Sequence, residues 1–367
     1  MIYTIEKVTT LIGARRFGST DAKIGFILTD SRSLCFPEET LFFALKSGRN
    51  DGHRYILELY HRGVRNFVVT EVPANYASDY PQANFLKVVD SLESLQRLAE
   101  RHRDEFNIPI VGITGSNGKT MVKEWLNQLL SDDLFVTRSP RSYNSQVGVP
   151  LSVWLLNEHS QVGVFEAGIS QPGEMLALRD IIQPTIAVLT NLGDAHQENF
   201  VSREAKCKEK LVLFHDAKIV VYNGDDSLIS DCVNALEDFR GERLYWSCSD
   251  HNAPFFVKSI EKKATATTIT YIYKGIESWY SLPFIDDASI TNSFACAAVA
   301  LTLGVSKDAL DERMLQLEPI AMRLEVKQGQ HGCTLINDSY NSDINSLDIA
   351  LDFMNRRPRT PSYFDIK

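Results

Sequence analysis

Long apolar runs, paired cysteines and an excess of basic residues are all absent from this sequence of 367 residues. No stretch approaches the roughly 20 consecutive apolar residues that a membrane-spanning helix needs, and the first residues lack the apolar core of a secretion signal. The six cysteines form no C-x-x-C pair, which argues against a disulfide framework or a zinc ribbon. These absences predict a protein of the reducing cytoplasm, without a membrane span.

Acidic side chains outnumber basic ones in this chain. It holds 47 Asp and Glu against 38 Lys and Arg, a net charge of -9. Because nucleic acids and anionic membranes attract basic surfaces, we expect no nucleic-acid partner, while a local phosphate site remains compatible with this charge. With 44% apolar side chains, the chain is long enough to bury a core in two or three domains, and we expect a monomer.

Strand-like runs that alternate with helical patterns predict an α/β protein. Short apolar runs and helical stretches predict a small α/β domain over residues 1–107. Residues 108–316 predict a central domain with a mostly parallel, doubly wound sheet, and apolar-polar alternation within 254–285 predicts an antiparallel appendage. Residues 317–367 offer one strand and one helix, too few to bury a core, so we expect them to be a fragment of a third domain. The expected strands from residue 108 on are Ile110–Thr114, Val162–Phe165, Thr185–Thr190, Lys218–Tyr222 and Thr334–Asn337, and the expected helices are Gly173–Ile182, Ser202–Phe214, Ile290–Gly304 and Ile344–Asn355.

A glycine-rich segment follows the first central strand and leads into a helix that we expect to begin near Lys119. Glycines let backbone N–H groups turn toward phosphate oxygens, and a helix N-terminus favours negative charge. In such a loop Lys119 reaches the β and γ phosphates of a nucleotide, and Thr120 holds a Mg²⁺ ion. Ile113 breaks the strict Walker A spacing, so a tight turn that needs glycine for steric reasons is the alternative. The loop residues are Gly115, Ser116, Asn117, Gly118, Lys119 and Thr120.

The run T-G-S-N-G-K-T resembles the phosphate loop of the Mur ligases and of their relatives, the folylpolyglutamate synthetases. Glu166, in V-F-E-A-G, matches a Mg²⁺-binding glutamate of this family, and His196 lies in a segment similar to its N-x-G-x-A-H-x-E-x-F pattern. Lys210 stands four residues before Phe214, and MurF-like members carry a carbamylated lysine four residues before an aromatic residue in this helix. The K-C-K-E-K run by itself is instead typical of a solvated basic face. The resemblance implies the metal ligands Thr120, Glu166, His196 and Lys210, and catalytic roles for Lys119, His196 and Lys210.

Two segments resemble the part of the family's site that lies near the nucleotide base. Asn223 and Asp226 belong to an N-G-D-D turn, and Asn292 lies near the start of an expected helix in a pattern similar to N-x-x-A-A. The resemblance implies that all three bind the nucleotide. Each alone is also typical of a turn or a helix cap.

The N-terminal domain resembles the family's UDP-sugar-binding region. Ser31 and Arg32 belong to T-D-S-R, and Asp51 and His53 belong to D-G-H. Arginine suits a diphosphate because its planar fork is permanently charged. The resemblance therefore implies that these four residues bind substrate, although each short motif is also an ordinary turn composition.

Two further segments favour the MurF branch of the family. S-Y-N-S-Q-V-G-V-P resembles N-x-N-N-x-I-G-x-P and implies substrate contacts for Asn144 and for Ser145, which replaces the second asparagine. N-D-S-Y-N resembles D-D-x-Y-N and implies a nucleotide contact for Asp338, although the next residues depart from the family's A-N-P. Arg323, in M-R-L-E, resembles an arginine at the entry to the family's third domain and is expected to bind the nucleotide.

The resemblance covers about residues 25–355 and implies a UDP-sugar-binding domain, an ATP-binding central domain and part of a Rossmann-like third domain. It implies an ATP- and Mg²⁺-dependent ligase of peptidoglycan synthesis. Such an enzyme joins D-alanyl-D-alanine to UDP-N-acetylmuramoyl-tripeptide through an acyl phosphate. Two alternatives stay open: a MurE-like or folylpolyglutamate-type ligase that uses another amine, and a chain that binds nucleotide and UDP-sugar without joining anything.

Overall fold

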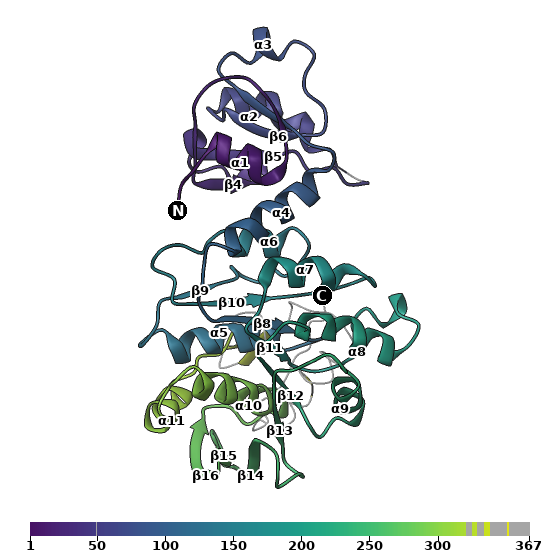
Figure 1. Ribbon diagram of the computed structural model, residues 1–367. Coiled ribbons are helices and arrows are strands. Elements are labelled where there is room, and N and C mark those ends of the chain that lie inside the picture. The colour runs from purple at the N-terminus through teal and green to yellow at the C-terminus, as the bar shows by residue number, and fades with distance from the viewer. Residues whose placement is uncertain (49, 321–324, 329–333, 338–350, 352–367) are drawn as a thin grey trace.

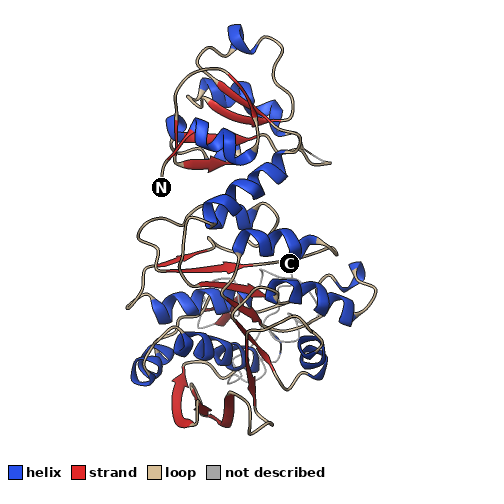
Figure 2. Cartoon of the chain, in the orientation of Figure 1, coloured by secondary structure: helices blue, strands red, loops and turns tan. Residues whose placement is uncertain are grey.

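The computed structural model describes residues 1–48, 50–320, 325–328, 334–337 and 351 of the chain. Figure 1 shows a smaller N-terminal body above a larger central one, with helix α4 (Ser91–Arg103) leading from the first into the second. Figure 2 shows that helices cover the central strands on both sides. The predicted α/β class is therefore confirmed.

The N-terminal body is built on a five-stranded sheet among the described residues, in the order β2-β7-β6-β5-β4. Strands β4 to β7 are parallel, and β2 pairs antiparallel with β7. Helices α1 and α4 cover one face and α2 covers the other, so alternate strand residues enter two small cores. The elements are β1 Tyr3–Thr4, α1 Ile5–Ile12, β2 Arg15–Phe17, β3 Lys23–Ile24, β4 Phe26–Leu28, β5 Thr40–Phe43, α2 Ile56–His61, β6 Asn66–Val69, α3 Tyr76–Asp79 and β7 Asn84–Lys87.

The central sheet has nine strands within the described part of the chain, in the order β16-β15-β14-β13-β12-β11-β8-β10-β9. Within it, the seven strands β8 to β14 pair with one another in parallel, whereas β15 pairs antiparallel with both β14 and β16. The strands are β8 Ile110–Thr114, β9 Val136–Arg138, β10 Val162–Glu166, β11 Ile186–Leu189, β12 Ile219–Asn223, β13 Glu242–Ser247, β14 Phe255–Lys262, β15 Thr267–Tyr273 and β16 Ile276–Leu282. The helices are α5 Lys119–Leu130, α6 Gly148–Val153, α7 Glu174–Ile182, α8 Arg203–Leu211, α9 Ser227–Asn234, α10 Asp287–Thr302 and α11 Lys307–Leu315.

Alternation along the buried strands places side chains in two layers. Val111 and Ile113 of β8 face the core under α5, α10 and α11. Ile110 of the same strand and Phe165 of β10 face the core under α6, α7 and α8. Because both faces are covered, these strands are apolar throughout and read as continuous hydrophobic runs in the sequence.

The expected antiparallel appendage is present, but it is not a separate sheet. Its first strand, β14, pairs in parallel with β13, so β15 and β16 extend the main sheet.

The sequence pattern missed two strands, β9 and β13. It also placed the start of α10 about one turn too late, because Asp286 rather than a later residue caps this helix. The expected strand at Thr334–Asn337 is present as β18 and pairs antiparallel with β17 (Glu325–Gln328). Apart from residue 351, the helix expected at 344–355 lies outside the described residues. No helix in the described ranges has the length and apolar content to cross a membrane.

The two bodies meet through a buried cluster of rings. Helix α4 packs against α1 on one side and against α6 and α7 on the other. His102 Nδ1 lies 2.9 Å from the Tyr3 hydroxyl, and His102 Nε2 lies 3.0 Å from the Leu156 carbonyl oxygen. A carbonyl oxygen can only accept, so His102 carries its proton on Nε2 and Nδ1 accepts from Tyr3. Burial lowers the pKa of His102 to about 4, which keeps the ring uncharged at this junction.

Candidate active site

The phosphate loop follows β8 and requires glycine at two positions. Gly115 has a φ of 142°, and a Cβ there would lie 2.0 Å from Thr190 Oγ1. Gly118 has a φ of 83°, and a Cβ there would lie 2.5 Å from Asn292 Oδ1. A side chain at either position would clash with a neighbouring segment and would disfavour the backbone conformation. The steric explanation for these glycines is therefore correct, and it is compatible with a phosphate site.

The segment after β11 supports this loop. The Ser116 N–H donates to the Asn191 carbonyl oxygen at 3.1 Å, and the Asn117 N–H donates to Asn191 Oδ1 at 2.9 Å. Lys119, the first residue of α5, turns its ammonium back over the loop and donates to the carbonyl oxygens of Gly115 and Ser116 at 2.8 and 3.0 Å. A cation is thus already held above the glycine-rich turn, where a phosphate would neutralise it.

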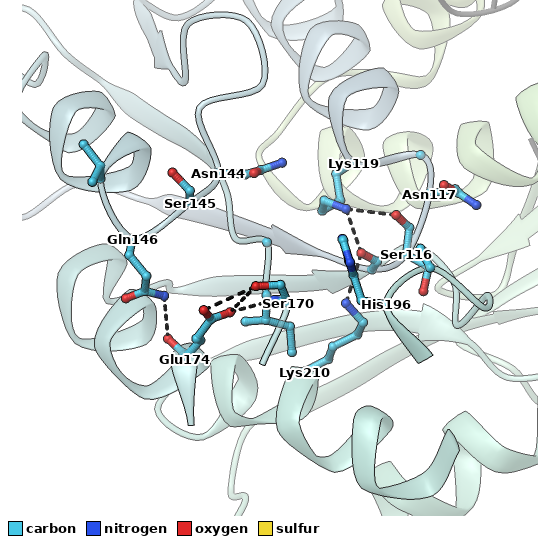
Figure 3. Close-up of a pocket in the computed structure, with 16 residues that line it drawn as sticks. Ser116, Asn117, Lys119, Asn144, Ser145, Gln146, Ser170, Glu174, His196 and Lys210 are labelled. Carbon is cyan, nitrogen blue, oxygen red and sulfur yellow. Dashed lines mark hydrogen bonds between the residues drawn. The ribbon is translucent and has the colours of Figure 1, made fainter. Parts of the chain in front are cut away.

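Most of the predicted residues of the central domain line one cavity of about 560 Å³. Figure 3 shows Lys119, His196 and Lys210 at one end and Gln146, Ser170 and Glu174 at the other. The predicted residues among its walls are Gly115, Ser116, Asn117, Gly118, Lys119, Asn144, Ser145, His196 and Lys210. The fold therefore brings together segments that are nearly a hundred residues apart in the sequence.

Thr120 and Glu166 form a buried pair beside this cavity. The Thr120 hydroxyl donates to Glu166 Oε2 at 3.2 Å, and Asn144 Nδ2 donates to the same oxygen at 3.3 Å. Glu166 is fully buried, and its Oε1 accepts no directed hydrogen bond from the described residues. A hydroxyl and a carboxylate beside a phosphate loop are the oxygen donors that Mg²⁺ prefers, because this ion keeps several waters and binds through one or two carboxylates plus phosphates.

The wider metal set expected from the sequence is not tested by the described residues. His196 and Lys210 line the cavity, whereas Glu166 does not. No group of three or more His, Cys, Asp or Glu side chains with metal-binding geometry occurs within the described ranges. The roles of Glu166, His196 and Lys210 as shared ligands stay predictions.

The three lysines of the K-C-K-E-K run occupy different environments. Lys210 is 3% exposed, and its Nζ donates to the Gly115 carbonyl oxygen at 3.2 Å. Burial, and then the positive charges of Lys119 and Lys206, hold the pKa of Lys210 well below its usual range. Lys206 is also buried and donates to Gly193, whereas Lys208 is exposed and pairs with Glu204. A solvated basic face therefore describes Lys208, while Lys210 has the depressed pKa that an amine needs to react with CO₂.

His196 lies at the cavity wall in an uncommon backbone conformation. Its φ is 59°, in the left-handed region, just before a short 3-10 helix at Gln197–Asn199. Residues other than glycine adopt this region infrequently, although histidine, asparagine and aspartate do so more often than most. The loop is therefore shaped to turn at His196, beside Lys119 and Lys210 (Figure 3).

The residues expected near the nucleotide base do not line this cavity. Asp226 caps α9 by accepting from the Ile229 N–H at 3.1 Å, and Asn223 Oδ1 accepts from the Asp225 N–H at 2.9 Å. Asn292 is not a helix cap, since α10 begins at Asp287; its side chain instead packs against Gly118 of the phosphate loop. The turn and cap interpretation accounts for Asp226 and Asn223, and a nucleotide contact of all three stays a prediction.

The expected substrate residues of the N-terminal body separate into two places. Asp51 and His53 line a second cavity of about 230 Å³, where Asp51 Oδ1 lies 2.6 Å from His53 Nδ1 and the Thr70 N–H donates to His53 Nε2 at 3.1 Å. Ser31 and Arg32 are not among its walls. The Arg32 side chain is 87% exposed and pairs with Asp30 at 2.6 Å. Arg323 and Asp338 lie outside the described residues.

Sequence reasoning missed several residues around the central cavity. Gln146, Ser170 and Glu174 line it, and Glu174 accepts from the Ser170 N–H at 2.6 Å, which closes the turn before α7. Lys123 was also missed, although it is fully buried and lies 3.2 Å from Glu166. Its position four residues after Lys119, on the same face of α5, is the signal that could have found it.

A family model for the Mur ligase middle domain matches residues 113–300, more than half of the chain. The chain belongs to the Mur ligase family. The match begins in β8 and ends in α10, so it covers the phosphate loop, Glu166, His196 and Lys210. The phosphate loop, Glu166 and His196 lie at or after the carboxyl ends of the neighbouring parallel strands β8, β10 and β11, where α/β proteins bind ligands, and Lys210 reaches the loop from helix α8.

This Mur ligase is similar to MurF-type proteins. It is 28% identical to the UDP-N-acetylmuramoyl-tripeptide–D-alanyl-D-alanine ligase of Bacillus subtilis over 89% of its own length and 69% of the relative's. Its fold matches a crystal structure of MurF from Acinetobacter baumannii with a TM-score of 0.87 and 23% identity, over 98% of this chain and 77% of that one. It also matches MurF from Thermotoga maritima in complex with ADP, with a TM-score of 0.77 and 25% identity, over 95% and 76% of the two chains.

Proposed function

We propose that this Mur ligase joins D-alanyl-D-alanine to UDP-N-acetylmuramoyl-tripeptide in the cytoplasm, using ATP and Mg²⁺. The observation that carries the proposal is the single cavity in which the phosphate loop, Asn144, Ser145, His196 and Lys210 meet. The similarity to proteins of that name, and to a MurF solved with ADP, supports it. Such a cavity can hold a nucleotide phosphate and a second anionic substrate side by side.

The chemistry required is activation of a carboxylate. A carboxylate is a poor electrophile, so its oxygen first attacks the γ-phosphorus of ATP, which releases ADP and leaves an acyl phosphate. The amine of D-alanyl-D-alanine then attacks the carbonyl carbon, phosphate leaves with the electron pair of the broken C–O bond, and the amine gives up a proton. Lys119 stabilises the charge on the transferred phosphoryl oxygens, and the shared cavity holds the reactants side by side.

The remaining side chains hold the reactants. Thr120 and Glu166 would bind Mg²⁺, which neutralises phosphate charge and polarises the phosphoryl oxygens when it is present. Lys210, as a carbamate, and His196 would orient the carboxylate end of the tripeptide. Asn144 and Ser145, which line the same cavity, would also contact this substrate.

The test is ADP formation by the purified chain with ATP and Mg²⁺. We expect ADP only when UDP-N-acetylmuramoyl-tripeptide and D-alanyl-D-alanine are both added, together with a pentapeptide product of the matching mass. Replacing D-alanyl-D-alanine with glutamate or with single amino acids gives the control for a MurE-like or folylpolyglutamate-type ligase. ADP formation that does not depend on either substrate would contradict the proposal and would favour a chain that binds nucleotide and UDP-sugar without catalysing ligation.

A further inference from the structure

Lys123 is a fully buried cation that the proposed chemistry does not use. It lies on α5, one turn after Lys119, and its Nζ is 3.2 Å from Glu166 Oε1. Both side chains are completely shielded from solvent. A buried carboxylate without a compensating charge is strongly unfavourable, so this ammonium offsets the cost of burying Glu166.

The other acidic neighbour of Lys123 depends on it less. Glu124 Oε1 lies 2.9 Å from Lys123 Nζ, but Glu124 also accepts from Arg138 Nε at 2.9 Å and keeps 22% of its side chain exposed. Glu166 Oε1, in contrast, accepts no directed hydrogen bond within the described part of the chain. The ion pair with Lys123 therefore matters more for Glu166 than for Glu124.

Lys123 also binds the segment that leads to the substrate residues. Its Nζ donates to the Ser139 carbonyl oxygen at 2.9 Å and to the Arg141 carbonyl oxygen. Ser139 Oγ in turn accepts from the Glu166 N–H at 3.2 Å. The same segment continues to Asn144, which donates to Glu166 Oε2 from the cavity wall.

We infer that Lys123 is a positioning residue, a built-in counter-ion that keeps Glu166 and segment 139–145 assembled before any metal ion binds. The inference rests on the proposed function in one respect, since it takes Glu166 as a ligand of Mg²⁺. Lys123 stands in for part of the metal's charge and joins the metal carboxylate to the substrate segment through one ammonium group. Because Lys123 already pairs with Glu166, the protein would need a bound Mg²⁺ less for its stability.

The experiment is a double-mutant cycle of thermal unfolding with Lys123→Met, Glu166→Gln and the double variant, each with and without MgCl₂ plus ADP. Without metal, Lys123→Met should lower the unfolding midpoint by on the order of 5 to 10 °C, because it leaves a buried carboxylate unpaired. Adding Glu166→Gln should recover most of that loss, since no charge is left to compensate. Mg²⁺ with ADP should raise the midpoint of Lys123→Met more than that of the unmodified protein.

Two controls separate a counter-ion from simple packing. Lys208→Met, at an exposed ion pair, should change neither the midpoint nor the metal-dependent shift. Lys123→Arg keeps the charge, so its metal-dependent shift should stay near that of the unmodified protein even if its midpoint falls. Should Lys123→Met not fold, the double variant is still expected to fold and to unfold within a few degrees of Glu166→Gln.

Three outcomes would each overturn the inference. The first is that the midpoint changes of the two single variants are additive in the double variant. The others are equal metal-dependent shifts for Lys123→Met and Lys123→Arg, and a double variant that does not fold. None of these readouts uses the ligase reaction. A failure of the proposed function would instead appear as ADP formation in the unmodified protein that does not depend on D-alanyl-D-alanine. The two failures are therefore distinguishable.

Discussion

The cavity at the phosphate loop draws its side chains from segments far apart in the chain, whereas the N-terminal motifs are held mainly by their own neighbours. Lys210 reaches the carbonyl oxygen of Gly115, and Asn144 reaches Glu166 across 22 positions. Arg32, in contrast, pairs with a residue only two positions away and leaves most of its side chain in solvent. The central site is thus organised before substrate binds, while Arg32 is exposed and is held by its pair with Asp30.

This difference predicts how variants of the two regions behave. A preorganised charge acts most strongly on the transition state, so its loss lowers kcat. An exposed side chain that orders only on binding contributes to affinity, so its loss raises KM. Three substitutions test this contrast and a fourth tests the junction between the two bodies, from the largest expected effect on turnover to the smallest.

Lys119→Ala should remove the cation above the phosphate loop and abolish ADP formation, with a loss of about a thousandfold or more in kcat. ADP release under saturating substrates measures it. Lys208→Ala, at an exposed pair, is the control and should leave turnover unchanged. Retained turnover in Lys119→Ala would refute the role assigned to this residue.

Lys210→Ala should lower kcat by roughly a hundredfold or more, because the side chain proposed to orient the substrate carboxylate is lost from the cavity wall. Short carboxylates added to the buffer should restore part of the rate if Lys210 acts as a carbamate. Lys206→Ala is the matched control, since Lys206 is equally buried but bonds the Gly193 carbonyl oxygen. Rescue of both variants, or of neither, would count against the carbamate.

Arg32→Ala should raise KM for the UDP-sugar substrate by roughly tenfold to a hundredfold, as expected for lost hydrogen bonds to a charged group. The unfolding midpoint should hardly move, since exposed ion pairs of this kind contribute little to stability. Arg101→Ala is the control because Arg101 also pairs with a near neighbour, Asp104. A fall in kcat with unchanged KM would break the contrast between the two regions.

His102→Gln should have the smallest effect on turnover and should instead change how stability depends on pH. Burial lowers the pKa of His102 from 6.5 to about 4. As the pH falls, the unfolded chain therefore binds a proton on this ring at a higher pH than the folded chain does. Stability present above pH 6.5 is therefore lost as the pH falls toward 4, by up to about 3 kcal/mol. Urea unfolding at several pH values measures this slope, which the variant should lack over that interval. Exposed His61→Gln should keep the full slope.

Much of the central fold could be predicted because its strands are buried on both faces. Continuous apolar runs marked β8, β10, β11 and β12, and the glycines marked the turn into α5. Strand β13 escaped notice because its half-buried residues Arg243 and Tyr245 alternate with buried ones, so the segment lacks a continuous apolar run. Strand β13 pairs in parallel with β14, and this pairing joins the antiparallel strands to the main sheet. The pairing depends on contacts between strands, so it leaves no local pattern in the sequence.

Candidate residues were easier to name than to interpret. The sequence motifs identified Lys119, Asn144, His196 and Lys210, which all line the cavity. The resemblance singled out Lys210 by its spacing to Phe214, but the composition of the lysine run could not separate it from Lys208, because the burial of a lysine depends on what packs over the helix. Asp226 shows the reverse, since a residue resembling a nucleotide ligand is held as a helix cap.

The sequence by itself determined the α/β class, the glycine-rich turn and the residue types available for phosphate and Mg²⁺, because these depend on local periodicity and backbone conformation. The tertiary structure alone decided which side chains share a cavity, which lysine is desolvated, and that Lys123 lies beside Glu166. Burial and ion pairing are properties of distances between remote segments. A chain acquires those distances only when its strands take their order in the sheet.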